Sequence, residues 1–272
     1  MGESILTQHE KDLERIRNFR LMDDDFMTSF FNEDPETVQF VLRIIMNKED
    51  LIVKSVKTQY KLHNLRGRSV ALDVFATDSN GEMLDIEIQR SDRGAGAKRA
   101  RYHSCLIDSN ALARSAEPLL LPVSYVIFIT ENDVLQKELP IYHVERVITE
   151  LNVLFNDGEH ILYVNGQNNN LETELGKLMH DFRQSDPGKM FYPLLAQKAR
   201  FFKETEEGIE IMCRAMEEMR TEAAHAAVLE YKKESIARKL KRNFTPEQIH
   251  ETDELPMELI LEVQKELLQL IQ

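Results

Sequence analysis

Three polar residues alternate with apolar ones in the run from Met83 to Gln89. In a β-strand, side chains two residues apart project from the same face. The leucine and the two isoleucines of this run therefore form an apolar face that must pack into a core. The opposite face carries Asp85, Glu87 and Gln89. A row of oxygen-bearing side chains held on a rigid strand is a pattern able to hold a divalent cation.

A fourth polar residue, Asp73, lies within an earlier strand-like run, Val70–Thr77. The two runs are separated by a turn that contains Asn80-Gly81, a strong signal for a β-hairpin. The hairpin places Asp73 within reach of Glu87. Two neighbouring carboxylates repel each other, burial adds to that cost, and a bound divalent cation removes both penalties. The alternative is an edge hairpin whose acidic face is solvated.

The charge distribution favours a phosphodiester substrate, although the net charge of the chain is -13. Binding to nucleic acid depends on local fields more than on the sum. Residues 54–68 contain five basic residues and no acidic one, and residues 90–101 contain five basic residues and one acidic. These stretches flank the hairpin residues, an arrangement that a solvated acidic face does not need. We expect DNA contacts from Lys54, Lys57, Arg66, Arg68, Arg90, Arg93, Lys98, Arg99, Arg101 and Tyr102.

The spacing of the acidic residues resembles a known nuclease motif. Asp73, thirteen residues and then Glu87-Ile-Gln89 are similar to the D–(E/D)-x-K site of the PD-(D/E)XK nuclease superfamily, with Gln in place of Lys. One branch of it, the recombination-promoting nuclease family often labelled transposases, resembles the chain over roughly residues 18 to 220. The matching segments are Arg20–Met27, Asn64–Asp73, Ile86–Tyr102 and Tyr125–Glu131.

The resemblance implies a DNA endonuclease that hydrolyses phosphodiester bonds with Mg²⁺ or Mn²⁺, acting in DNA recombination, mobile-element or phage-defence biology. Asp73 and Glu87 would hold the metal ion. Gln89 would orient water or phosphate, but an amide carries no positive charge. Asp25 matches the upstream acidic position of the superfamily; its alternative role is to cap a helix. Two other functions stay open: a DNA-binding or regulatory protein that does not cut, and a self-associating protein that acts through its tail.

The order of the predicted elements indicates an α/β fold. The pattern predicts helices over residues 8–22 and after Pro35, a strand over 51–60, the hairpin, a helix over 98–113 and strands over 125–129 and 161–164. This order describes a mixed central sheet with helices on its faces. The resemblance names it as a restriction-endonuclease-like core.

The C-terminal part is predicted to be almost wholly helical. We expect a nuclease-like domain over residues 1–200 and an α-helical extension over residues 201–272. Ile236–Leu240, Thr245–Ile249 and Leu255–Ile260 resemble a small helix-turn-helix. Helix packing, a homodimer contact or another partner contact are the alternatives for so acidic a segment.

Several other classes of protein are excluded by composition. The two cysteines rule out a disulfide framework and a Cys-rich zinc module, and a reducing cytoplasm suits them. No apolar stretch is long enough to span a bilayer and the N-terminus lacks a signal-peptide pattern, so we expect a cytoplasmic protein with no membrane partner. Gly94-Ala-Gly-Ala-Lys98 lacks the residues of a phosphate-binding loop, and His103, like the other histidines, has no partner at zinc spacing.

Overall fold

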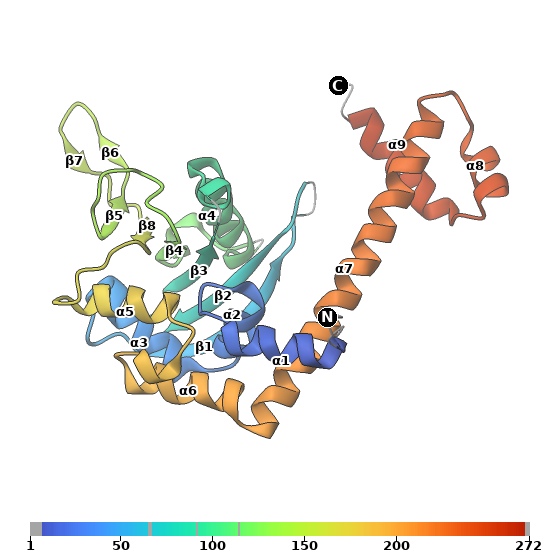
Figure 1. Ribbon diagram of the computed structural model, residues 1–272. Coiled ribbons are helices and arrows are strands. Elements are labelled where there is room, and N and C mark those ends of the chain that lie inside the picture. Colours follow the sequence, from blue (N-terminus) through green and yellow to red (C-terminus); the bar gives the residue numbers. More distant parts are fainter. Residues whose placement is uncertain (1–6, 65–66, 91, 114, 270–272) are drawn as a thin grey trace. The chain divides into compact units, whose positions relative to one another are not determined.

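The computed structural model describes residues 7–64, 67–90, 92–113 and 115–269, which divide into one compact unit up to Ala215 and a second from Met216 onward. The first unit is built on a six-stranded sheet in the order β1-β2-β3-β4-β8-β5 (Figure 1). Its strands are β1 Val53–Leu62, β2 Val70–Asp78, β3 Met83–Gln89, β4 Ser124–Thr130, β5 Ile141–Val144 and β8 Glu159–Asn165. Two short strands, β6 Val147–Ile148 and β7 Val153–Leu154, form a separate hairpin.

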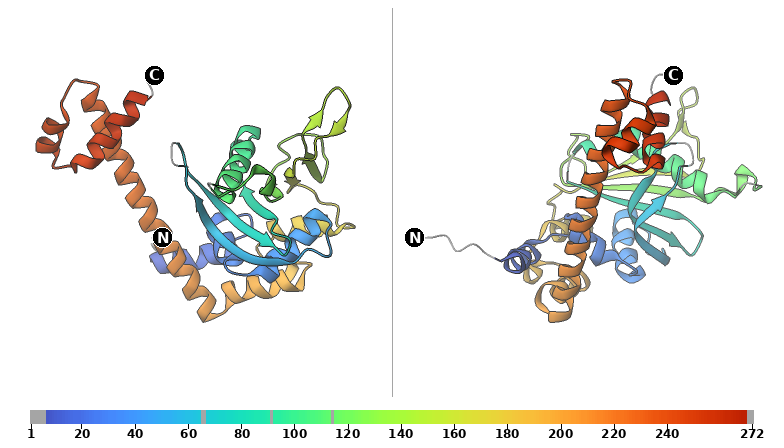
Figure 2. Two further views of the ribbon diagram at one scale, coloured as in Figure 1. Left: turned by 180° about the vertical axis from the view of Figure 1, so that it is seen from behind. Right: turned by 90° about the vertical axis from the view of Figure 1, so that its right-hand side faces the viewer.

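The sheet is mixed. β1, β2 and β3 are antiparallel neighbours, β3, β4 and β8 run parallel, and β5 returns antiparallel to β8. Figures 1 and 2 show α4 over one face of the sheet and α2 and α3 over the other. The helices of the first unit are α1 Gln8–Asn18, α2 Asp24–Phe31, α3 Pro35–Met46, α4 Ala97–Ala111, α5 Glu174–Arg183 and α6 Pro193–Glu204; α7 Glu206–Leu240 continues into the second. Short 3₁₀ turns are η1 Asp92–Ala95, η2 Pro118–Leu120 and η3 Pro187–Lys189. The predicted α/β class, a mixed sheet flanked by helices with a helical C-terminal region, is confirmed.

Two apolar layers pack the helices of this unit, one against the sheet and one between helices. Leu106 and Ile107 of α4 pack with Phe128 of β4 and Tyr163 of β8 in one buried cluster. α2, α5 and α6 meet in a second, aromatic layer in which Phe26 and Phe30 contact Phe202, and Phe31 contacts Phe182. Each fully buried aromatic contributes a few kcal/mol through removal of its surface from water, about 25 cal/mol per Å².

The β2–β3 hairpin is closed at its turn and open at its far end. Asp78 accepts hydrogen bonds from the backbone N–H groups of Asn80 and Glu82, both 2.8 Å, and Gly81 takes a positive φ of 82°. The ladder runs from Thr77 opposite Met83 to Val74 opposite Ile86 and stops there. Beyond this point β2 continues beside β1, and β3 continues beside β4. The sheet therefore forks at the next pair of positions, Asp73 and Glu87.

The second unit has its own small core. Ile236, Ile249, Ile260 and Val263 are buried together. They come from the end of α7, from α8 Pro246–Asp253 and from α9 Met257–Gln269. A capping box between Thr245 and Gln248 begins α8. Among the described residues, no helix combines the length and the apolar character that a membrane crossing requires.

Candidate active site

Asp73 and Glu87 face each other at the fork and bond across it. The backbone N–H of Asp73 donates to Glu87 Oε1 at 3.1 Å, and the backbone N–H of Ile88 donates to Asp73 Oδ2 at 3.0 Å. The carboxylates thus accept the N–H groups that the interrupted ladder leaves without backbone partners. Glu87 is fully buried and Asp73 is 9% exposed. The structure brings together the two residues that the sequence pattern singles out.

Burial and mutual repulsion make this pair hard to ionise. Burial raises the pKa of Asp73 to about 7, with a further contribution from the charge of Glu87. Burial also raises the pKa of Glu87 to about 7, with Asp85 as the next cause. Near neutral pH such a pair can exchange its protons for a divalent cation. The donor set, oxygens of two buried carboxyls beside a cavity, fits Mg²⁺ or Mn²⁺.

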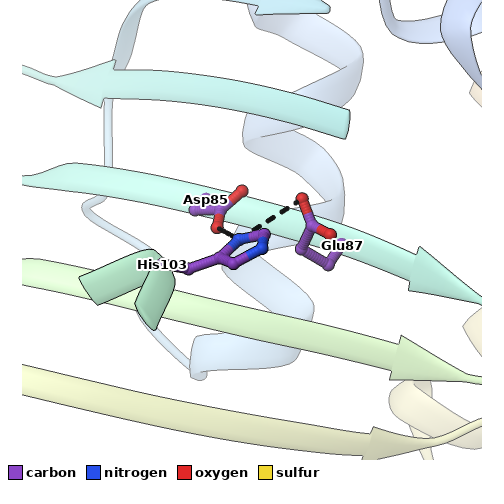
Figure 3. Close-up of side chains that lie close together, drawn as sticks. All are labelled: Asp85, Glu87 and His103. Carbon is purple, nitrogen blue, oxygen red and sulfur yellow. Dashed lines mark hydrogen bonds and ion pairs between the residues drawn. The ribbon is translucent and has the colours of Figure 1, made fainter. Parts of the chain in front are cut away.

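Asp85 of β3 and His103 of α4 extend this polar group (Figure 3). His103 Nδ1 lies 2.9 Å from Asp85 Oδ2 and 3.7 Å from Glu87 Oε1. One ligand atom from each of the three residues lies within 4.8 Å of the others, and all three are buried. Asp85 Oδ1 has no hydrogen-bond partner in the described part of the chain. Burial raises the pKa of Asp85 well above its usual range and lowers the pKa of His103.

In the sequence, Asp85 is only a member of the polar row on its strand and has no assigned role, and His103 is not among the candidates. The signal that could have found His103 is helical spacing, because His103 shares its helix face with Arg99, four residues earlier. The partners of His103 lie on a strand of the sheet, at a distance in sequence that a search for zinc spacing does not cover.

Two side chains contact the remaining oxygen of Glu87. Arg99 Nη2 donates to Glu87 Oε2 at 2.8 Å, and Gln89 Nε2 lies 3.4 Å from the same atom. Arg99 Nε also donates to His103 Nε2 at 3.3 Å. Gly94 of η1 lies against the Gln89 amide, where a Cβ would come within 1.8 Å of Oε1. The segment after β3 thus fits closely over Gln89.

A cavity of about 790 Å³ opens beside the fork, and its lining includes four aspartates and four arginines. Asp73, Gln89 and Arg99 line it together with residues from α1, α2 and their connection. Asp25 lines it too, and its carboxylate pairs with Arg15 at 2.5 Å. The neighbouring Asp24 acts on the site directly, because its charge contributes to the raised pKa of Asp73. Burial and the charges of Asp25 and Asp23 raise the pKa of Asp24 in turn.

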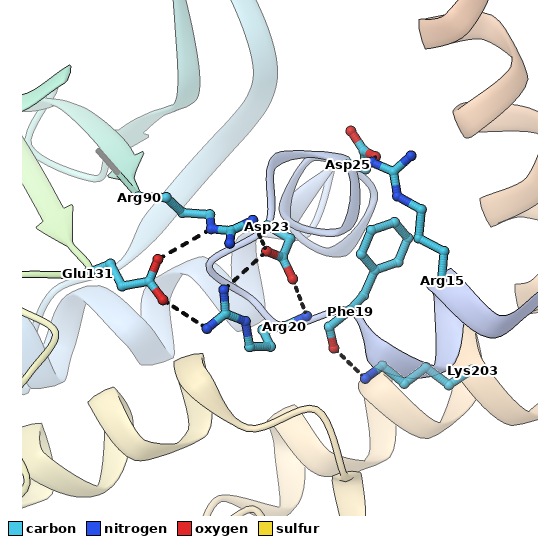
Figure 4. A network of polar contacts seen from close by, with 8 residues as sticks. All are labelled: Arg15, Phe19, Arg20, Asp23, Asp25, Arg90, Glu131 and Lys203. Atoms are coloured by element: carbon cyan, nitrogen blue, oxygen red, sulfur yellow. Dashed lines mark hydrogen bonds and ion pairs between the residues drawn. The ribbon is translucent and has the colours of Figure 1, made fainter. Parts of the chain in front are cut away.

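A ring of four charged residues borders this cavity (Figure 4). Arg90 donates to Asp23 at 2.8 Å and to Glu131 at 3.3 Å. Arg20 pairs with the same two carboxylates, with Glu131 at 2.8 Å and with Asp23 at 3.4 Å. The ring ties the start of α2 to the ends of β3 and β4. Arg90, a predicted DNA contact, is therefore engaged by two carboxylates.

The other predicted DNA contacts fall in three places. Arg68, Lys98, Arg99 and Tyr102 line a second cavity of about 520 Å³. Tyr102 Oη donates to the carbonyl of Arg68 and accepts from Asn64 Nδ2 at 3.1 Å. These bonds link α4 to two residues that precede β2. Three more, Arg101 on α4 and Lys54 and Lys57 on β1, are exposed and line neither of these two cavities. Arg66 and the side chain of Arg93 lie outside the described residues.

The fold and site together define a class: a restriction-endonuclease-like α/β core whose acidic residues gather where an antiparallel hairpin joins parallel strands. A comparison with protein families identifies the particular family. The model of the PD-(D/E)XK nuclease family transposase matches residues 32–239, and the chain belongs to this family. Neither the curated proteins nor the solved structures contain a match to the chain. Membership implies a nuclease with DNA as its partner.

Proposed function

We propose that this protein is a metal-dependent DNA endonuclease whose Asp73 and Glu87 hold Mg²⁺ or Mn²⁺. The observation that carries the proposal is the buried carboxyl pair at the fork, whose pKa values are raised to about 7 by burial and by repulsion from neighbouring carboxylates. Family membership supports the reaction class.

The residues around the pair have complementary roles in this proposal. When bound, a divalent cation would stabilise negative charge on a phosphoryl oxygen and lower the pKa of a water molecule. Asp73 and Glu87 hold it, and Asp24 and Asp25 strengthen the negative potential of the cavity from α2. The amide of Gln89 donates a hydrogen bond to water or phosphate.

In this proposal, positive charge next to this cavity holds the DNA strand. Arg68 and Lys98 line the second cavity, whose described lining contains no carboxylate. Arg101 is exposed on the same helix as Lys98. Contacts of this kind position the backbone of DNA without reading its sequence.

The test is nicking of supercoiled plasmid with Mg²⁺ or Mn²⁺. Asp73→Asn and Glu87→Gln each remove a charged ligand with little change in shape. Each should lower the rate about 100-fold or more, equivalent to ~3 kcal/mol of transition-state stabilisation. Glu210→Gln is the matched control, because Glu210 is an exposed carboxylate that pairs with Arg214 on the same helix, four residues later. Nicking that persists in both site variants would show that the pair is misassigned. Metal-independent DNA binding without nicking would favour the non-cutting alternative.

A further inference from the structure

The proposed site lacks a positive charge on its own strand. Asp73, Asp85 and Glu87 are acids, and Gln89 is neutral. A phosphodiester under attack gathers negative charge on its non-bridging oxygens, and preorganised cationic donors stabilise that charge. A cation supplied from another element would complete the site.

Arg99 of α4 is placed to be that cation. Its Nη2 donates to Glu87 Oε2, the atom that Gln89 Nε2 also approaches, so the guanidinium and the amide of Gln89 meet at one oxygen. The bond from Arg99 Nε to His103, which is itself held by Asp85, fixes the plane of the guanidinium. The side chain is 41% exposed although Glu87 is fully buried. Arg99 lines both the cavity beside the fork and the second, basic cavity.

The other arginines that line the cavity beside the fork pair with carboxylates outside the fork. Arg15 pairs with Asp25, while Arg20 and Arg90 pair with Asp23 and Glu131. Among the described residues, the ion pairs to the fork carboxylates include no lysine and no second arginine. Of the four arginines that line this cavity, Arg99 is therefore the one that pairs with a fork carboxylate.

We propose that Arg99 is a catalytic residue that contacts the scissile phosphate and neutralises its developing charge, an inference that rests on the proposed function. In the reaction a water oxygen bonds to phosphorus and releases a proton to solvent. The bond from phosphorus to the leaving sugar oxygen breaks, and that oxygen takes up a proton from solvent. During both bond changes the guanidinium N–H groups donate hydrogen bonds to the non-bridging oxygens. The planar fork of N–H groups matches the geometry of a phosphate.

The role of Arg99 is tested by separating cutting from metal binding. Arg99→Met keeps the apolar stem and removes the charge. We expect it to lower kcat for plasmid nicking about 100-fold or more. Calorimetry without DNA should give Arg99→Met an affinity for Mn²⁺ that equals or exceeds that of the unaltered protein, because the variant has no arginine that competes for Glu87. Arg99→Lys should retain intermediate activity, and Arg214→Ala is the control for an exposed, paired arginine.

A second variant tests the charge itself. Gln89→Lys in the Arg99→Met protein places an ammonium beside Glu87 Oε2 and should restore at least about 10-fold of the lost rate. Nicking by Arg99→Met at the unaltered rate would overturn the inference. So would weaker Mn²⁺ binding that accounts for the loss, because Arg99 would then only position Glu87. If the unaltered protein and the Arg214→Ala control also fail to nick, the proposed function falls and takes this inference with it.

Discussion

Asp73 and Glu87 make the stability of the metal-free protein depend on pH. Their folded-state pKa values of about 7 exceed those of unfolded chains, which lie near 4, so the folded state keeps protons that the unfolded state loses. The resulting stability is fully present below about pH 4 and is lost as the pH rises toward 7. Metal-free protein should therefore lose several degrees of Tm between about pH 5 and 8, on the order of a few kcal/mol.

Calorimetry of Asp73→Asn is the check on this pH dependence. The variant should show a smaller fall in Tm, because one of the two titrating groups is gone. Excess Mg²⁺ should recover the Tm of the unaltered protein at about pH 8, since the cation binds the ionised pair. An equal fall in the variant and the unaltered protein would locate the titrating groups elsewhere.

His103 should contribute to stability through Asp85. The carboxyl of Asp85 is fully buried, and the ring of His103 bonds to its Oδ2. His103→Leu leaves a buried carboxyl without that partner and should cost about 2–4 kcal/mol in urea unfolding. Adding Asp85→Leu should cost less than the sum of the single changes, because both remove one interaction. Additive costs would mean that the two residues act independently.

At the scale of elements, the charged ring holds α2 against the sheet. Arg20, Asp23, Arg90 and Glu131 are partly exposed, so each pair contributes little to stability. Their joint effect is to fix where the acidic start of α2 lies. Glu131→Gln should therefore lower nicking about 10-fold while unfolding changes by less than ~1 kcal/mol. Unchanged nicking kinetics would show that the placement of α2 does not matter for the reaction.

Local patterns predict the hairpin well, and long-range packing sets what the sequence leaves out. The alternation of apolar and polar residues and the Asn80-Gly81 turn place Asp73 near Glu87. Both signals can be read from sequence because they depend only on residues close together in the chain. The row of polar residues on β3 looks like an open face in sequence. It is buried in the structure, because α4 lies over it and supplies Arg99 and His103.

The end of α1 shows the same limit. Apolar spacing predicts a helix over residues 8–22, but α1 ends at Asn18. The buried Nζ of Lys203, far along the chain on α6, contacts the carbonyl of Phe19 at 2.5 Å (Figure 4). This contact uses a carbonyl just beyond the helix, and no local pattern reveals it. The turn that follows brings Asp23, Asp24 and Asp25 to the cavity, so their individual roles could not be assigned from spacing alone.

At the scale of the whole molecule, the C-terminal unit has a core of its own. Ile260 is fully buried with Ile249 and Ile236. Ile260→Ala should cost about 2–4 kcal/mol, and hydrogen exchange should show lost protection over residues 216–269 while β3 and β4 stay protected. Faster exchange in the sheet as well would mean that the units unfold together. DNA reading or dimerisation by this extension, and the predicted domain boundary at residue 200, stay predictions.

The central claim, that Asp73 and Glu87 share a metal ion, is tested most directly by a crystal structure with Mn²⁺ and its anomalous scattering. We predict one strong anomalous peak at the fork, within ~2.0–2.3 Å of an oxygen from each of the two carboxylates. A peak bound by Asp85 and His103 without Asp73 would contradict the assignment. Absence of any peak at the fork, at Mn²⁺ concentrations that support nicking, would contradict it as well.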